Sequence, residues 1–265
     1  QKNTYKRKKH KKTYWLHLTF LPSNKEYICL NFIIIINLWF NTFMLNTLHQ
    51  DKQIIVLNKQ AGVSVLNEGW DENALFLKAM LEKKFGRIWV VHRLDKVTSG
   101  VIVFARNAEA HRHLNTQFEK REVDKTYHAI VEDYPEWNEY TARHSLHVNV
   151  GRKHRTVVDN HRGKPSETDF KVIKQWHPVG HRQAYSMIEA KPKTGRTHQI
   201  RVHLSTSGLP IVADILYGAE ESDLIARAAL HAYELSIEHP VKREKMTFTA
   251  PYPEDFKQLI DQLDQ

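Results

Sequence analysis

The stretch that decides the fold covers residues 91–105 and reads VHRLDKVTSGVIVFA. Its second half, residues 101–105, is an unbroken apolar run rich in β-branched side chains, which predicts a strand buried on both faces. Its first half places His92, Arg93 and Asp95 just before a Thr-Ser-Gly turn signal. Loops that lead into a rigid central strand often carry catalytic groups. The same pattern is also compatible with a loop on which Arg93 and Asp95 are only solvated.

The charge of the chain is unevenly distributed. The sequence has 265 residues, long enough for a substantial core, and a formal net charge of +9. Residues 1–50 hold eight Lys or Arg and one acid, so they contribute +7 of that charge. The remaining 215 residues carry 31 basic and 29 acidic side chains, a net +2. The high overall charge is therefore weak evidence for a polyanionic partner, and local basic clusters must supply that evidence instead.

Cysteine and histidine usage narrows the kinds of site. Cys29 is the only cysteine, which excludes an intramolecular disulfide and a cysteine-rich zinc site and is typical of a reducing compartment. We therefore expect a cytoplasmic protein. The chain has 17 histidines, but no His-Glu-x-x-His motif occurs. We expect no metal, and a metal-dependent hydrolase is an unfavoured alternative that activity in excess chelator would dismiss.

Residues 1–48 are unlike the rest of the chain. A lysine-rich start precedes a mostly apolar stretch, residues 27–48, which is interrupted by four asparagines. A positive flank before about twenty apolar residues is the pattern of a membrane anchor, but an unpaired amide in hydrocarbon is costly. The chain begins with Gln1, and Met44 stands just before the first well-patterned strand. We expect the segment to be non-native or disordered first, an extension second and an anchor last, with residues 49–265 forming one domain.

From residue 51 onward, the hydrophobic pattern predicts an α+β domain with a mixed, mainly antiparallel sheet flanked by helices. Residues 167–175 and 184–191 alternate apolar with polar side chains, which predicts neighbouring antiparallel strands. The other predicted strands cover residues 54–57, 101–105, 125–131, 230–237 and 246–248. The predicted helices cover residues 71–85, 107–120, 197–208, 220–230 and 255–263, with N-terminal caps at residues 71–73, Asn107 and Thr197 and C-terminal stops at Gly86 and Gly208.

Chemistry-bearing residues gather in two further segments. The loop RKHR at residues 152–155, followed closely by the basic residues 161–164, is better evidence of a polyanion partner than the N-terminal tail. In residues 193–204, a helix would bring His198 and Arg201 to one face. A lone helical Arg is usually exposed and unimportant, but two Arg and two His within eight residues weaken that interpretation.

Three segments together resemble the RluA family of RNA pseudouridine synthases. Residues 92–95, HRLD, with the following Thr-Ser-Gly match the catalytic motif of that family, residues 125–127 match its Lys-x-Tyr motif, and residues 195–203, GRTHQIRVH, match its third motif. The resemblance spans about Leu48 to Phe256 and implies the pseudouridine synthase fold, in a minimal form without an S4-type domain. Supporting matches include Asn58-Lys59, Gly163-Lys164-Pro165, and Asp214 with Tyr217-Gly218.

The resemblance also implies an activity, the conversion of a uridine in structured RNA, a tRNA or a large-subunit rRNA, to pseudouridine without a cofactor. Asp95 matches the nucleophile, Arg201 the partner that ion-pairs with it, and Tyr127 the residue that stacks on the base and helps to remove the C5 proton. A Tyr at such a place is otherwise more often core packing. The target base must leave its stack, and Arg93 matches the residue that enters the vacated space. The other residues expected to contact RNA are His92, Arg196, His198, Arg152, Lys153 and Arg155.

Partners and alternatives follow from the same residues. We expect an RNA partner, no DNA, no membrane and a monomeric protein. A non-catalytic RNA-binding protein would use the same basic loops without needing Asp95, so Asp95→Asn separates the two interpretations. Two positions depart from the family pattern: Gln60 stands where Pro is usual, and Ala213 where Gly is usual. These departures put the shape of two loops in doubt but leave the chemistry unchanged.

Overall fold

The computed structural model describes residues 45–67, 76–177 and 184–265. Leu45–Gln265 forms one compact unit, and its first strand, β1, begins at Thr47. Residues 1–44 are not among the described residues, so the predictions made for this part of the N-terminal segment lie outside the structure. In the part of the chain that the structure describes, no helix is both long and apolar enough to cross a membrane.

The described strands form one mixed sheet. Its order is β1-β2-β4-β10-β5-β9-β8-β6-β7, with β11 pairing with β10 and β3 with β4. Among the described strands, β4 and β10 pair in parallel and the other neighbours are antiparallel. The prediction of a mixed, mainly antiparallel α+β fold is therefore confirmed. The strands are β1 (Thr47–Gln50), β2 (Ile54–Lys59), β3 (Trp89–Val90), β4 (Ser99–Ala105), β5 (Asp124–Glu132), β6 (Glu139–Val150), β7 (Arg155–Val158), β8 (Lys164–Trp176), β9 (Tyr185–Pro192), β10 (Leu230–Glu238) and β11 (Lys245–Thr249).

Strand β4 is the buried centre of one half of the sheet. All of its residues are buried, as the apolar run predicts, between antiparallel β2 and parallel β10. Gly100, the residue just before this run, has φ 115°, and a Cβ there would lie 2.1 Å from the carbonyl oxygen of Ala232. Glycine is therefore required where β4 approaches β10. Because β4 is fixed in this way, the loop that precedes it is anchored at its C-terminal end.

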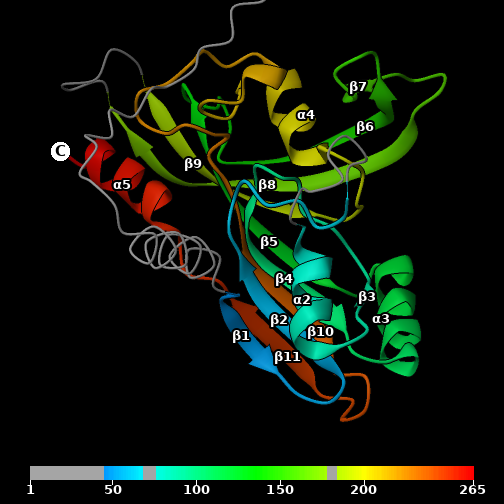
Figure 1. The fold of residues 1–265 in the computed structure, drawn as a ribbon. Coiled ribbons are helices and arrows are strands. Elements are labelled where there is room, and N and C mark those ends of the chain that lie inside the picture. Colours follow the sequence, from blue (N-terminus) through cyan, green and yellow to red (C-terminus); the bar gives the residue numbers. More distant parts are fainter. Residues whose placement is uncertain (1–44, 68–75, 178–183) are drawn as a thin grey trace, which may run out of the picture. The chain divides into compact units, whose positions relative to one another are not determined.

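The helices lie on two halves of the sheet (Figure 1). Helices α2 (Leu77–Phe85) and α3 (Ala108–Lys120) lie beside the half of the sheet that contains β2 and β4. Helix α4 (Gln199–Thr206) packs against β6 to β9. Helix α5 (Glu254–Leu263) buries its apolar face in the larger core, which also takes in α4 and β5, β8 and β9. A short 3₁₀ turn, η1 (Ile215–Tyr217), follows α4.

The predicted helix signals succeed where a local cap decides the boundary. Asn107 accepts the Ala110 backbone N–H at 2.8 Å and begins α3, as predicted. Gly86 ends α2, but the predicted cap at residues 71–73 lies outside the described residues. Helix α4 is also present, but its N-cap is His198 rather than Thr197.

The predicted helix over residues 220–230 is wrong. This segment has no regular structure before β10 begins at Leu230. Its backbone groups bond to other parts of the fold: the Ala229 N–H donates to Val212, and the Ala229 carbonyl accepts from Ile130. Its side chains Ile225, Ala228 and Ala229 are buried in the core. The backbone groups that would bond within a helix here bond instead to segments far away in the sequence.

Strands β6 and β7 were not predicted. Along β6 few residues are fully buried, so the polar sequence carries little period-2 signal. Strand β8 pairs with β6 on one side and β9 on the other, which confirms the predicted pairing of residues 167–175 with 184–191. The basic residues 152–155 lie at the turn from β6 into β7.

Candidate active site

The predicted catalytic residues lie in one cleft of about 1690 Å³. It is lined by the 91–98 loop, the start of β5, residues 192–201, residues 213–216 and residues 226–228. Asp95, Tyr127 and Arg201 all line it, although they are far apart in the sequence. The Asp95 side chain retains 24% of its exposure and that of Arg201 only 6%. A partly accessible carboxylate therefore stands beside a buried guanidinium.

Arg201 is shared between two carboxylates. Its Nη1 lies 3.4 Å from Asp95 Oδ2, so the predicted contact is present. Its tighter partner is Asp214, which accepts from Nε and from Nη2, both at 2.7 Å. The Asp214 side chain is 1% exposed, and the face of the Tyr217 ring lies 4.9 Å from the guanidinium carbon. This forked pair and the ring hold Arg201 in one orientation.

Sequence reasoning gave Asp214 no role beyond a supporting motif match. The preceding residue, Ala213, has φ 60°, in the left-handed region where glycine is favoured. The chain thus keeps the backbone geometry expected of a glycine at this position while carrying alanine. Alanine therefore makes this turn less favourable in energy than glycine would.

Tyr127 is on β5, facing the same cleft as Asp95. Burial raises the pKa of its phenol, and the charge of Asp95 raises it further. The phenol therefore stays protonated at neutral pH. Lys125, two residues earlier on the strand, also lines the cleft, and burial, followed by the charge of Arg121, lowers its pKa to about 8.

The backbone around Asp95 is held by a buried lysine that sequence reasoning did not single out. Lys59 is 2% exposed, and its Nζ donates to the carbonyls of Gln60 and Val63 at 2.9 Å and of Lys96 at 3.4 Å. The Lys96 carbonyl also accepts the Gly62 N–H at 2.7 Å. Burial, followed by the charge of Arg227, lowers the pKa of Lys59 to about 7. In the sequence, Lys59 was noted only within the supporting match Asn58-Lys59, and a lysine at the end of an apolar strand is by itself typical of an exposed residue.

A second guanidinium fixes the other end of the same loop. Arg227 donates to the Val97 carbonyl at 3.1 Å and to Ser99 Oγ at 3.2 Å, and Asp255 on α5 accepts from it at 2.7 and 3.0 Å. Ser99 Oγ lies 2.9 Å from His231 Nδ1, whose ring is fully buried. The loop that carries Asp95 is thus tied to β2, β10 and α5.

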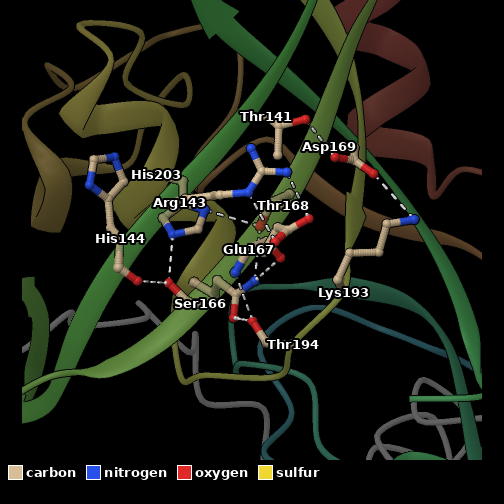
Figure 2. Close-up of polar contacts among 11 residues, drawn as sticks. Thr141, Arg143, His144, Ser166, Glu167, Thr168, Asp169, Lys193, Thr194 and His203 are labelled. Atoms are coloured by element: carbon tan, nitrogen blue, oxygen red, sulfur yellow. Dashed lines mark hydrogen bonds and ion pairs between the residues drawn. The ribbon is translucent and has the colours of Figure 1, made fainter.

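Helix α4 stands on a buried polar network (Figure 2). The His203 imidazole lies between Ser166 Oγ, at 2.9 Å, and Thr168 Oγ1, at 3.0 Å, and Ser166 donates to the His144 carbonyl. Gln199, in the first turn of α4, donates to the same Thr168 hydroxyl at 2.9 Å. Because both helix residues are buried and bonded to β8, the helix turn that carries Arg201 has a defined height above the sheet.

The residues predicted to contact RNA are divided between exposed and buried environments. Arg93 is exposed at the cleft, and Lys153 lines it from the β6–β7 turn. Arg196 also lines the cleft, with its guanidinium near the Pro165 carbonyl at 3.3 and 3.4 Å. The side chains of Arg152 and Arg155 are exposed at the same turn as Lys153 but are not part of the cleft wall.

The two histidines of this set face protein groups. His92 Nε2 accepts the Val103 N–H at 3.1 Å, its ring stacks on Phe118, and burial lowers its pKa to about 3. His198 points its Nδ1 at the Tyr217 hydroxyl, 2.9 Å away, and its Nε2 at Asp95 Oδ2, 3.8 Å away. Both imidazoles therefore contribute to the architecture of the site.

The fold is that of pseudouridine synthases. The structure of human RNA pseudouridylate synthase domain containing 1 superposes with a TM-score of 0.65 at 28% identity, covering 83% of this chain and 95% of that one. The structure of human RNA pseudouridylate synthase domain containing 4, at 22% identity, has the same fold with a TM-score of 0.67. The fold therefore places the chain in the structural class of the pseudouridine synthases.

The sequence comparisons show the family to which the chain belongs. The RNA pseudouridylate synthase family profile matches residues 53–206, and the chain belongs to this family. It is 35% identical to the uncharacterized RNA pseudouridine synthase YhcT of Bacillus subtilis, over 81% of this chain and 71% of that protein. It is 33% identical to ribosomal large subunit pseudouridine synthase C of Vibrio vulnificus, over 82% and 68%. The protein is thus an RluA-type isomerase that converts uridine in RNA to pseudouridine.

Proposed function

We propose that Asp95 is the nucleophile of this isomerisation. The observation that supports it most is the position of the carboxylate: it is partly accessible in the cleft, while Arg201 contacts its Oδ2 at 3.4 Å. The reaction breaks the bond from N1 of uracil to C1′ and joins C5 to C1′, so a group must hold the sugar or the base while the base rotates. A carboxylate kept in place by a buried guanidinium is suited to that role.

Tyr127 is proposed to stack on the base and to assist the loss of the C5 proton. Its raised pKa keeps the phenol neutral, so the residue does not act as a strongly basic phenolate. A neutral phenol instead supplies an aromatic platform for the base and a hydroxyl that relays the proton. The uridine reaches this platform by leaving its helix or loop, which costs a few kcal/mol. The exposed Arg93 is proposed to enter the space that the base leaves, because its planar cation stacks on neighbouring bases.

The RNA backbone is proposed to lie along the basic rim of the cleft. Arg196 and Lys153 line the cleft, and Arg152 and Arg155 are exposed at the adjoining turn. Binding should then weaken as salt rises, with a slope of roughly one per phosphate contacted. A variant with Arg152, Lys153 and Arg155 replaced by glutamine should show a shallower slope of the logarithm of affinity against the logarithm of salt.

The substrate is proposed to be a stem-loop of large-subunit rRNA, with tRNA as the alternative. The relatives named as ribosomal large subunit pseudouridine synthases support the first. We also propose that the protein acts as a monomer in the cytoplasm. Mapping pseudouridine in total RNA from cells with and without the protein, by carbodiimide-dependent reverse-transcription stops, identifies the modified position and decides between the two RNA classes.

Asp95→Asn tests the chemical role. The variant should bind the mapped RNA with unchanged affinity and form no pseudouridine. Asp261→Asn, at an exposed position on α5, is the matched control and should retain full activity. Product formation by Asp95→Asn would refute the assignment of the nucleophile. Loss of RNA binding together with activity would show that Asp95 acts in binding.

A further inference from the structure

The Asp95 carboxylate has a second neighbour besides Arg201. His198 Nε2 lies 3.8 Å from Asp95 Oδ2, the same oxygen that Arg201 Nη1 approaches at 3.4 Å. Contacts of catalytic groups are often long before substrate binds and shorten in the reacting complex. Both basic side chains therefore approach one oxygen and leave Oδ1 on the other side of the carboxylate.

The backbone of His198 has a conformation that residues other than glycine seldom adopt. The residue precedes the first residue of α4 with φ 54° and ψ 18°, in the left-handed region. Its side chain makes no capping hydrogen bond, and only its backbone carbonyl takes part in the helix start, accepting the Val202 N–H at 3.0 Å. Residues other than glycine in this region cost energy and cluster at functional sites. Here the conformation turns the imidazole toward Asp95.

The tautomer of His198 is assigned from its contact with Tyr217. The Thr156 backbone N–H donates to the Tyr217 hydroxyl at 2.8 Å, and that hydroxyl lies 2.9 Å from His198 Nδ1. Burial raises the pKa of Tyr217, so its hydroxyl stays protonated and can donate a hydrogen bond to Nδ1 while its oxygen accepts from Thr156. Burial lowers the pKa of His198, so the imidazole is neutral and its proton lies on Nε2.

The charged groups around His198 act in opposite directions on its pKa, and burial is the largest cause of the shift. Asp95 from the loop before β4 and Asp214 from the segment before η1 favour a protonated ring, while Arg201 on α4 opposes it. Tyr217 also packs on Arg201 and its carbonyl accepts from Ser205 on α4 at 2.6 Å. The tyrosine thus holds both groups that approach Asp95 Oδ2.

We propose that His198 is a positioning residue for Asp95: its Nε2–H, directed by the Tyr217 hydroxyl, donates to Oδ2 and leaves Oδ1 to react. This inference rests on the proposed role of Asp95 as nucleophile. Because Thr156 is the second residue of β7, which follows the basic β6–β7 turn, the same contacts connect the proposed RNA-binding turn to the carboxylate.

Two substitutions of His198 separate its contacts. His198→Asn suits the left-handed backbone and places an amide where Nδ1 was, so it retains the Tyr217 contact and loses the donor to Asp95. His198→Gln extends an amide N–H to the place of Nε2 and retains that donor. In single-turnover assays at saturating RNA, we expect His198→Asn to be about 30-fold slower and His198→Gln to recover most of the rate, each with RNA affinity within twofold of the parent.

A double-mutant cycle tests the link to Tyr217. Tyr217→Phe removes the hydroxyl and leaves the ring on Arg201, and we expect it to be roughly tenfold slower on its own but to have less than a twofold effect in the His198→Asn protein. Tyr134→Phe is the matched control and should retain the parent rate. The Tyr134 hydroxyl donates to the Trp176 carbonyl at 2.9 Å, and Tyr134 does not line the cleft.

The outcomes distinguish the inference from the function on which it rests. Equal rates for His198→Asn and the parent, or additive effects of His198→Asn and Tyr217→Phe, would overturn the positioning role and leave Asp95 as the nucleophile. Loss of RNA affinity with an unchanged rate at saturation would overturn it in favour of an RNA-contact role for His198. Activity of Asp95→Asn would instead remove the proposed function itself.

Discussion

Asp214→Asn is the substitution with the largest expected effect on both folding and catalysis. Asp214 is 1% exposed and holds Arg201 through two hydrogen bonds of 2.7 Å. Breaking one side of a buried ion pair costs about 3–5 kcal/mol because the remaining charge is left unpaired. Asp95 lies 3.4 Å away and can partly compensate, so we expect about 3 kcal/mol. A domain of this size should then melt roughly 6–12 °C lower.

The same change should also slow the reaction. Without its forked partner, Arg201 turns toward Asp95, and a displacement of about 1 Å in a catalytic site can cost roughly 100-fold in rate. The assays are urea unfolding and single-turnover pseudouridine formation. Glu167→Gln, which breaks a forked but exposed pair with Arg143, is the control and should cost less than about 1 kcal/mol. A loss below about 1 kcal/mol for Asp214→Asn, or a 3 kcal/mol loss with an unchanged rate, would refute the reasoning.

Three further predictions concern backbone geometry and pH. Ala213→Gly should raise the free energy of unfolding by about 0.5–1 kcal/mol, since it relieves a left-handed alanine but loosens the unfolded chain; a decrease in the urea midpoint would contradict this. Gly100→Ala should abolish soluble folded protein because its Cβ would meet the Ala232 carbonyl, whereas Gly62→Ala, at φ 86° with open space around it, should fold with a small loss, and equal behaviour of the two would exclude the steric explanation. Burial lowers the pKa of His203 to about 4, so the unfolded chain binds more protons than the native state between about pH 6.5 and pH 4, and stability should fall as the pH falls through this window. His203→Gln should show a smaller loss than the parent between pH 7.5 and pH 5 in urea melts, and an identical loss would assign the effect to other groups.

Local sequence signals predicted the elements whose boundaries depend on nearby atoms. The apolar run after residue 100 specifies β4 because a strand buried on both faces needs no polar alternation. Asn107 specifies the start of α3 because its side chain bonds to the backbone three residues later. The same logic failed at residues 220–230, where helix propensity was overridden by backbone bonds to Val212 and Ile130.

The sequence predicted which motif residues meet in the cleft, but it did not predict the contacts that hold them there. The motif residues Asp95, Tyr127 and Arg201 were identified from the sequence and lie in one cleft. The roles of Asp214 and Lys59 could not be read from the chain, because a buried charge is recognised by what surrounds it, and surface charges with the same local sequence are far more common.

The sequence by itself determined the family, the α+β class, the buried central strand and the residues that match the family motifs, since these depend on motif order and local periodicity. Only the tertiary structure decided which group each charge faces. Asp95 and Arg201 are 106 positions apart. Their contact depends on the pairing of β4, β10 and β5 in the sheet and on the polar network beneath α4. Such contacts are set by strand order and burial, which no short stretch of residues encodes.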